Sequence, residues 1–128
     1  MAKPKVGIVV GESLRKRILA EVDLEKLGSF ADVEINPNDE NLTGDEAAEF
    51  LAGMDGVFSS WNSGDLTPEI LETAPNLKIW AYGAGTIKGK VCDEAWEKGV
   101  IVTSAAPVIA DDVAELTMGF ITIGLRKV

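Results

Sequence analysis

Short apolar runs alternate along this chain with segments in which apolar residues recur at helical spacing. Residues 6–10 form a continuous, β-branched run, which is typical of a strand buried on both faces of a parallel sheet. A second apolar run, over residues 31–35, is ended by the turn-forming residues 36–39. We therefore predict five strands, over residues 6–10, 31–35, 56–59, 77–82 and 100–103.

Helical patterns separate these runs. Leu14, Ile18, Val22 and Leu27 predict one amphipathic helix over 12–28, ended by Gly28. Thr43 and Glu46 have the spacing of a capping box before a helix over 44–52, and Pro68 suits the first turn of a helix over 68–74. Further helices are expected over 90–98, ended by Gly99, and over 108–126, with Asp111, Asp112 and Glu115 near the start of the last.

Strands that alternate with helices predict an α/β fold, a three-layer flavodoxin-like sandwich around a five-stranded parallel sheet. We expect one domain over 1–107, with 108–128 as its terminal helix. The length of 128 residues fits one domain.

Composition narrows the possible functions. Twelve Lys and Arg against 21 Asp and Glu give a net charge of −9, which disfavours nucleic acid and anionic membranes as partners. The sequence has no histidine, so the commonest general base and the commonest metal ligand are absent, and we expect no metal site. Cys92 is the only cysteine, which excludes an internal disulfide and suits a cytoplasmic protein. The N-terminus lacks the long apolar centre of a signal peptide, and the apolar stretch 116–125 is well short of the roughly 20 residues that span a bilayer.

Ligands of such sheets bind beyond the carboxyl ends of the strands. In the turn Gly83-Ala84-Gly85, two glycines leave backbone N–H groups uncovered for a carboxylate, and Lys88 adds a positive charge. The alternative is that both glycines only permit a tight turn with positive φ. Ser60, Trp61 and Asn62 offer polar donors beside an aromatic wall, although a plain loop with Trp61 packed on a neighbour is an equal alternative. Glu12 is better explained as the first-turn acid of its helix than as a functional group.

Other doubly wound families lack support at these loops. A receiver domain needs acids after the first strand and an Asp at the end of the third, where this chain has Gly11-Glu12 and Ser59-Ser60. A flavodoxin would have a Ser/Thr- and Gly-rich phosphate loop after its first strand, where this chain has Gly11-Glu12-Ser13-Leu14. Gly83-Ala84-Gly85 lacks the third glycine of a dinucleotide motif, because that position holds Lys88.

Two stretches resemble consecutive signatures of the D-isomer-specific 2-hydroxyacid dehydrogenases, in the N-terminal segment of the substrate domain. The resemblance covers most of the chain and is specific from Leu66 onward; its stretches are 75–79 running into 83–86, 97–104, and the Val-Ala-Glu-Leu-Thr-Met-Gly of 113–119. It implies strand order 2-1-3-4-5. It also implies substrate contacts for Ser60, Trp61, Asn62, Gly83, Ala84, Gly85, Thr86 and Lys88.

The same resemblance implies a small anionic 2-hydroxy or 2-oxo acid as substrate and NAD as cofactor of the parent enzyme. The family's catalytic Arg, Glu and His and its NAD loop would follow Val128, so we expect no catalytic residue, no cofactor and no turnover for this chain alone. The sequence departs from the family pattern at two places. Ile87-Lys88 replaces a common Asp, which resembles a variant branch, and Ile109 replaces a usual Asn.

The last predicted helix is apolar on every side. We expect one face to lie on the sheet and the rest to be covered by the missing nucleotide-binding domain or by a second copy, in a homodimer with exchanged terminal helices. The other hypothesis is a free-standing or engineered flavodoxin-like module that self-associates and is not catalytic.

Overall fold

A five-stranded parallel sheet with strand order β2-β1-β3-β4-β5 forms the centre of the computed structural model, which describes residues 2–127. The predicted flavodoxin-like α/β fold and its strand order are confirmed. The elements in chain order are β1 (Lys5–Ile8), α1 (Glu12–Ile18), α2 (Glu21–Phe30), β2 (Asp32–Ile35), α3 (Gly44–Phe50), β3 (Gly56–Ser59), α4 (Pro68–Thr73), β4 (Ile79–Tyr82), α5 (Asp93–Glu97), β5 (Ile101–Ser104) and α6 (Ala106–Arg126).

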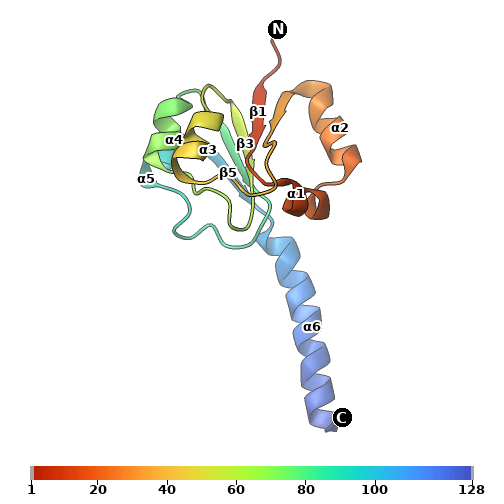
Figure 1. Ribbon diagram of the computed structural model, residues 1–128. Coiled ribbons are helices and arrows are strands. Elements are labelled where there is room, and N and C mark those ends of the chain that lie inside the picture. Colours follow the sequence, from red (N-terminus) through yellow and green to blue (C-terminus); the bar gives the residue numbers. More distant parts are fainter. Residues whose placement is uncertain (1, 128) are drawn as a thin grey trace.

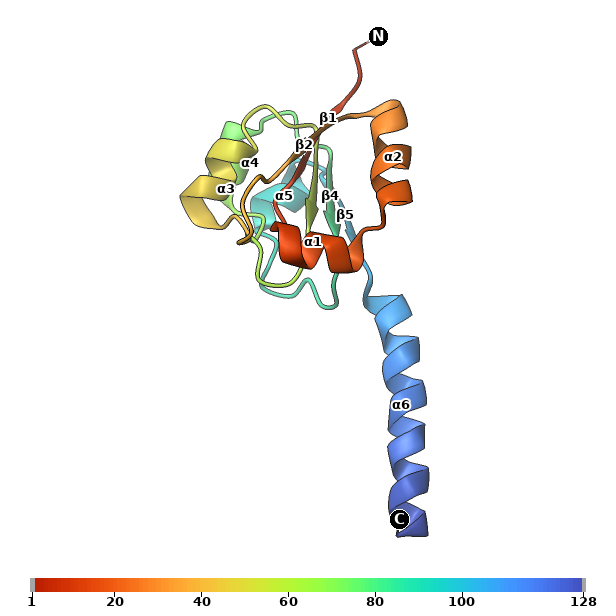
Figure 2. The ribbon, with the colours of Figure 1, turned by 45° about the vertical axis from the view of Figure 1, so that its right-hand side comes forward.

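The helices are shared unequally between the two faces of the sheet. Helices α3, α4 and α5 cover one face, and α2 lies on the other, with α1 beside the carboxyl edge (Figures 1 and 2). The core lies under α3, α4 and α5, where Trp80, Leu51 and Met54 are almost fully buried. Gly7 is required here, because a Cβ atom would lie 2.6 Å from Cδ2 of Leu51.

The predicted helix over 12–28 is wrong, because the chain turns into extended backbone at Leu19 and Ala20. The amide of Leu19 donates to Arg15 O and ends α1, while the amide of Ala20 donates to the Asp23 carboxylate and begins α2. Gly28 does not end the second helix, which continues to Phe30.

Three other expectations need correction. Thr43 occupies the N-cap of α3, but its side chain makes no capping hydrogen bond. Helix α5 begins at Asp93 instead of residue 90, so Cys92 is its N-cap residue. Helix α6 begins at Ala106, so Asp111, Asp112 and Glu115 lie beyond its first turn. Met1 and Val128, the outer limits of the expected segments 1–107 and 108–128, lie outside the described residues.

Helix α6 contradicts the expectation that one of its faces lies on the sheet. It continues away from the carboxyl edge and stands apart from the rest of the fold (Figures 1 and 2). None of its residues is buried. Within residues 2–127 no helix has the length and apolar character needed to cross a membrane.

Candidate functional site

The turn after β4 lies at the carboxyl edge of the sheet, and its three carbonyl groups are all hydrogen-bonded. Ser60 Oγ donates to Gly83 O at 3.1 Å, the amide of Ala105 donates to Ala84 O at 3.0 Å, and Ser104 Oγ donates to Gly85 O at 2.6 Å. The loops after β3 and β5 therefore fix this turn from both sides.

The amide groups of the same turn differ from its carbonyls, because most of them donate no hydrogen bond within the described residues. Gly83 N donates to Ser59 O at 2.8 Å, so this amide is already satisfied. Within residues 2–127 the amides of Ala84, Gly85 and Thr86 have no protein acceptor. Ala84 is fully buried, Gly85 is half-buried and Thr86 is exposed. Buried backbone donors are almost always paired, so the Ala84 amide is the unusual one of the three, whereas the amides of Gly85 and Thr86 are open to water or to a ligand.

The two glycines of the turn have different structural roles. Neither has a positive φ, so the alternative explanation from left-handed backbone does not apply to them. A Cβ atom at Gly83 would lie 2.6 Å from Cζ of Phe58, which accounts for this glycine by packing. A Cβ atom at Gly85 would meet no atom within 4 Å. Packing therefore does not require a glycine at position 85.

Ser60 and Ser63 shape the loop after β3. Ser63 Oγ accepts a hydrogen bond from the Ser60 amide at 2.7 Å and lies 2.8 Å from Ser59 Oγ, and all three serines are buried. This arrangement directs Trp61 and Asn62 outward, and both are exposed. Asn62 has a φ of 57°, a left-handed conformation that asparagine tolerates better than most residues.

Trp61 and Asn62 line a cavity of about 570 Å³ together with three residues of α1, namely Leu14, Arg17 and Ile18. Arg17 was not predicted as a site residue, although strand order places α1, which follows β1, beside the loop after β3. Asn41 was also missed. It joins the two loops, because its Oδ1 accepts from the Gly11 amide at 2.8 Å and its Nδ2 donates to Trp61 O at 3.0 Å.

Charged groups near the turn differ in their pairing. Lys88 is exposed, and its amide donates to Thr86 Oγ1 at 3.3 Å. Lys90 forms an ion pair with Asp65 at 2.9 Å, and the hydrogen bond to that carboxylate raises the lysine pKa. Glu12 pairs with Lys16, and this hydrogen bond lowers the Glu12 pKa. That pairing agrees with Glu12 as a first-turn acid.

Cys92 is a candidate nucleophile, and the acidic residues are candidate metal ligands. Burial raises the pKa of the Cys92 thiol, which disfavours the nucleophilic thiolate. Across residues 2–127 there is no group of three cysteine, aspartate or glutamate side chains placed to hold a metal ion.

Comparisons with known proteins agree with the family resemblance. The chain is 28% identical over 130 residues to the glyoxylate reductase of Thermofilum pendens, and the match covers 100% of the chain and 36% of that enzyme. A crystal structure of a Pyrococcus horikoshii OT3 protein is 30% identical, with a TM-score of 0.75 over 98% of this chain and 34% of that one. The NAD⁺-bound 3-phosphoglycerate dehydrogenase of Entamoeba histolytica is 26% identical, with a TM-score of 0.61 over 98% of this chain and 40% of that enzyme.

No protein-family model matches the chain. A putative D-isomer specific 2-hydroxyacid dehydrogenase of Polaromonas sp., 21% identical with a TM-score of 0.62, shares the fold. The chain spans roughly a third of the length of these relatives, whose matched shares are 36%, 34% and 40% for the first three.

Proposed function

We propose that this chain is the substrate-binding segment of an NAD-dependent oxidoreductase that acts on the CH–OH group of a 2-hydroxy acid. The turn after β4 is the main support at residue level, because its carbonyls are all hydrogen-bonded while the amides of Ala84, Gly85 and Thr86 have no protein acceptor within residues 2–127. The named relatives, a glyoxylate reductase and a 3-phosphoglycerate dehydrogenase, support the same class of reaction.

In this proposal the carboxylate of the acid lies over Gly85 and Thr86, which are more exposed than the buried Ala84. Gly83 holds the turn against Phe58, and Lys88 contributes a positive charge. Ser60 positions the turn, and Trp61 and Asn62 form the wall on the side of α1. A carboxylate held by backbone donors and one cation is oriented, which is the contribution that a substrate-binding segment makes to catalysis.

The turn after β4 lacks the form of a nicotinamide-cofactor site. Pyrophosphate groups bind at a helix N-terminus that follows a glycine-rich turn. After Gly83-Ala84-Gly85 the chain stays non-helical until α5 begins at Asp93. We therefore propose that the cofactor and the proton-transferring residues belong to a second part of the enzyme, with segments 1–107 and 108–128 as substrate domain and connecting helix.

Helix α6 would contact that second part or another copy of the chain, and we propose a homodimer for the chain alone. Its exposed apolar side chains also favour a second candidate function, a free-standing module that self-associates without catalysis. The two candidates differ in whether the turn after β4 binds a 2-oxo acid.

Titration of the isotope-labelled chain with oxalate, a stable mimic of a 2-oxo acid, tests the first proposal by NMR. We expect the amide signals of residues 84–88 to shift saturably, and acetate at equal ionic strength to shift them less. Absence of saturable shifts in this segment, together with self-association, would favour the non-catalytic module. Oxidation of NADH by the pure chain with any 2-oxo acid at ordinary enzymatic rates would contradict the assignment of the cofactor to a second part.

A further inference from the structure

One face of the sheet is only partly covered. A five-stranded sheet is roughly 20 Å wide and a helix with its side chains is about 10 Å across, so each face accommodates about two helices. On the face opposite α3, α4 and α5 only α2 packs over the strands (Figure 2). Ile101 of β5 is 61% exposed and Ile79 of β4 is 38% exposed, and their positions pair in register. The space for one helix beside α2 is therefore open.

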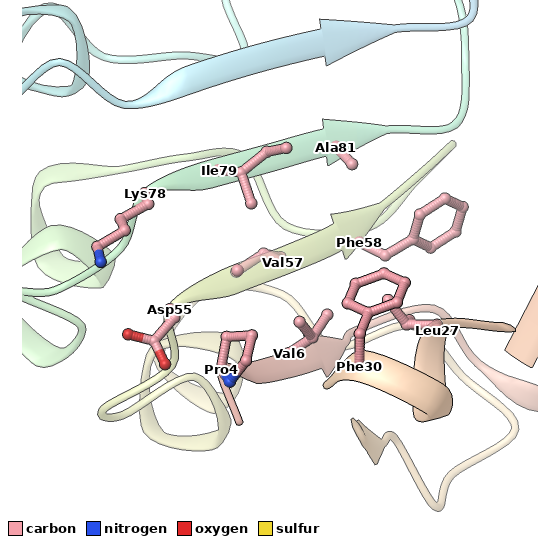
Figure 3. A pocket seen from close by; sticks show the side chains of 11 residues that line it. Pro4, Val6, Leu27, Phe30, Asp55, Val57, Phe58, Lys78, Ile79 and Ala81 are labelled. Carbon is pink, nitrogen blue, oxygen red and sulfur yellow. The ribbon is translucent and has the colours of Figure 1, made fainter. Parts of the chain in front are cut away.

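This space is an apolar groove with a defined floor. Val6, Gly56, Ile79 and Ile101 pair across four neighbouring strands, and Gly56 contributes no side chain between Val6 and Ile79. Leu27 and Phe30 of α2 form one wall, and Asp55 and Lys78 lie at the end where the strands begin (Figure 3). The part of the groove between α2 and Ile79 is a cavity of about 340 Å³, and Ile101 lies outside the lining of this cavity.

Helix α6 has an apolar stripe of matching character. Its residues recur at intervals of four and three, which places them on one side of a helix. They are Ile109, Val113, Leu116, Phe120 and Ile123. A shorter set, Met118, Ile121 and Leu125, lies on the opposite side. All of these side chains except Ile109 are exposed large hydrophobics.

The junction between β5 and α6 prevents α6 from reaching the groove of its own chain. A single residue, Ala105, separates the two elements, and its amide donates to Tyr82 O and Ala84 O. The amide of Ala106, the first residue of α6, donates to Ser104 Oγ at 3.0 Å. Folding α6 back over its own sheet would break these hydrogen bonds.

We infer that the groove is the docking site for α6 of a second copy of this chain, with the stripe from Ile109 to Ile123 facing Ile79 and Ile101. The inference rests on the self-association in the proposed function and names the surfaces that produce it. A two-fold axis perpendicular to the strands places each α6 over the groove of the other copy and antiparallel to its strands. That is the direction in which helices run in crossover connections of parallel sheets.

Charge distribution is consistent with this orientation. The acidic part of α6, residues 111–115, then lies toward the carboxyl edge of the other sheet, beside the basic residues 15–17 of α1. Arg126, at the end of α6, lies toward Asp55 and Lys78 at the opposite edge, so charge complementarity is confined to the end beside α1. Reversal of the helix would bring the acids close to Asp55 and Arg126 close to α1.

The length of the strands sets the size of the contact. Helix α6 has 21 residues and is roughly 31 Å long, whereas strands of four residues extend about 13 Å. A helix advances about 1.5 Å per residue, so strands of this length cover about nine residues of α6, which hold about three of the five stripe residues. The two-fold arrangement forms this contact twice.

Sedimentation equilibrium with three variants tests the inference. We expect the unmodified chain to be a dimer at micromolar concentration. Leu116→Glu on the stripe and Ile79→Glu in the groove should each raise the dimer dissociation constant at least about 100-fold, since a buried unpaired carboxylate costs several kcal/mol. Leu125→Glu on the opposite side of α6 is the matched control and should leave it unchanged. Ile101→Glu replaces Ile79→Glu if circular dichroism shows that the latter is unfolded.

A mixing experiment separates docking in the groove from direct pairing of two α6 helices. The Leu116→Glu chain has an intact groove and the Ile79→Glu chain has an intact α6. Their mixture should form heterodimers through one intact contact, whereas helix-to-helix pairing predicts no such recovery. A monomeric unmodified chain, an unaffected Ile79→Glu dimer, or a mixture that stays monomeric would each overturn the inference.

Oxalate binding measured on the same samples distinguishes this inference from the proposed function. A Leu116→Glu chain that is monomeric and still binds oxalate at residues 84–88 supports the docking site independently of catalysis. A dimer of the expected composition that does not bind oxalate would contradict the substrate-binding role alone.

Discussion

The hydroxyl of Ser60 donates a hydrogen bond to the carbonyl of Gly83 at 3.1 Å, and it connects the loop after β3 to the turn after β4. Ser60 is fully buried, so its removal leaves Gly83 O without this donor. We expect Ser60→Ala to lower the free energy of unfolding by about 0.5–1.5 kcal/mol, because the part-buried Gly83 carbonyl loses its donor. Urea denaturation checks this value. Ser29→Ala, on exposed α2, is the control and should change stability by less than about 0.5 kcal/mol.

Gly83 and Gly85 should respond in opposite ways to alanine. Gly83→Ala places a Cβ atom 2.6 Å from Phe58 Cζ and should destabilise the fold by about 1–3 kcal/mol. Gly85→Ala meets open space, so its stability should stay within about 0.5 kcal/mol of the unmodified chain. The new methyl group should nevertheless weaken oxalate binding, because it covers the side on which the proposed carboxylate lies. A large loss of stability in Gly85→Ala would show that packing alone explains this glycine.

Lys88→Met removes an exposed charge and should weaken oxalate binding by roughly twofold to fivefold, in keeping with a solvent-exposed ionic contact of up to about 1 kcal/mol. The thermal midpoint should not change. Lys26→Met on α2 alters the net charge equally and is the matched control. In a full-length enzyme the same Lys88 variant should raise KM for the acid, and an unchanged KM would remove Lys88 from the site.

The Lys90–Asp65 pair predicts a dependence of stability on pH. Hydrogen bonding to Asp65 raises the Lys90 pKa, so the protonated lysine is favoured in the folded state. Its contribution is therefore fully present below the ordinary lysine pKa and is lost as the pH rises through the raised value. Because both side chains are partly exposed, Lys90→Met should cost only about 0.2–1 kcal/mol at neutral pH. Urea denaturation across alkaline pH should show the difference between variant and unmodified chain disappearing; a difference that persists would assign it to packing on Tyr82.

The order and type of the strands could be predicted from local pattern and resemblance together. Residues 56–59 form β3 as expected, and Gly99, with a φ of 73°, lies just after α5 as the pattern indicates. The break at Leu19 and Ala20 could not be seen, because apolar residues keep helical spacing across it. At the break the Ala20 amide donates to the Asp23 carboxylate instead of to a backbone carbonyl of a continuous helix. This exchange of hydrogen-bond acceptors leaves the apolar pattern unchanged.

The site was predictable in position and less so in detail. Glycine spacing and sheet topology indicated the turn at 83–85, but only coordinates reveal that Gly83 N is paired with Ser59 O and that Gly85 lies in open space. Arg17 and Asn41 contribute through contacts between loops that are far apart in sequence. The exposed position of α6 could not be predicted either. An apolar pattern predicts that a helix is buried, but it does not specify which surface covers the helix.

Ser104 connects α6 to the turn after β4 and so couples the orientation of α6 to the proposed acid-binding site. Its hydroxyl accepts a hydrogen bond from the first amide of α6 and donates one to the carbonyl of Gly85. A reorientation of α6 by an attached domain or subunit would alter these two hydrogen bonds, one of which ends on the peptide group next to the proposed carboxylate. If the attached body changes the affinity of the turn for the acid, thermodynamic linkage requires that the acid change the affinity for the attached body by the same factor.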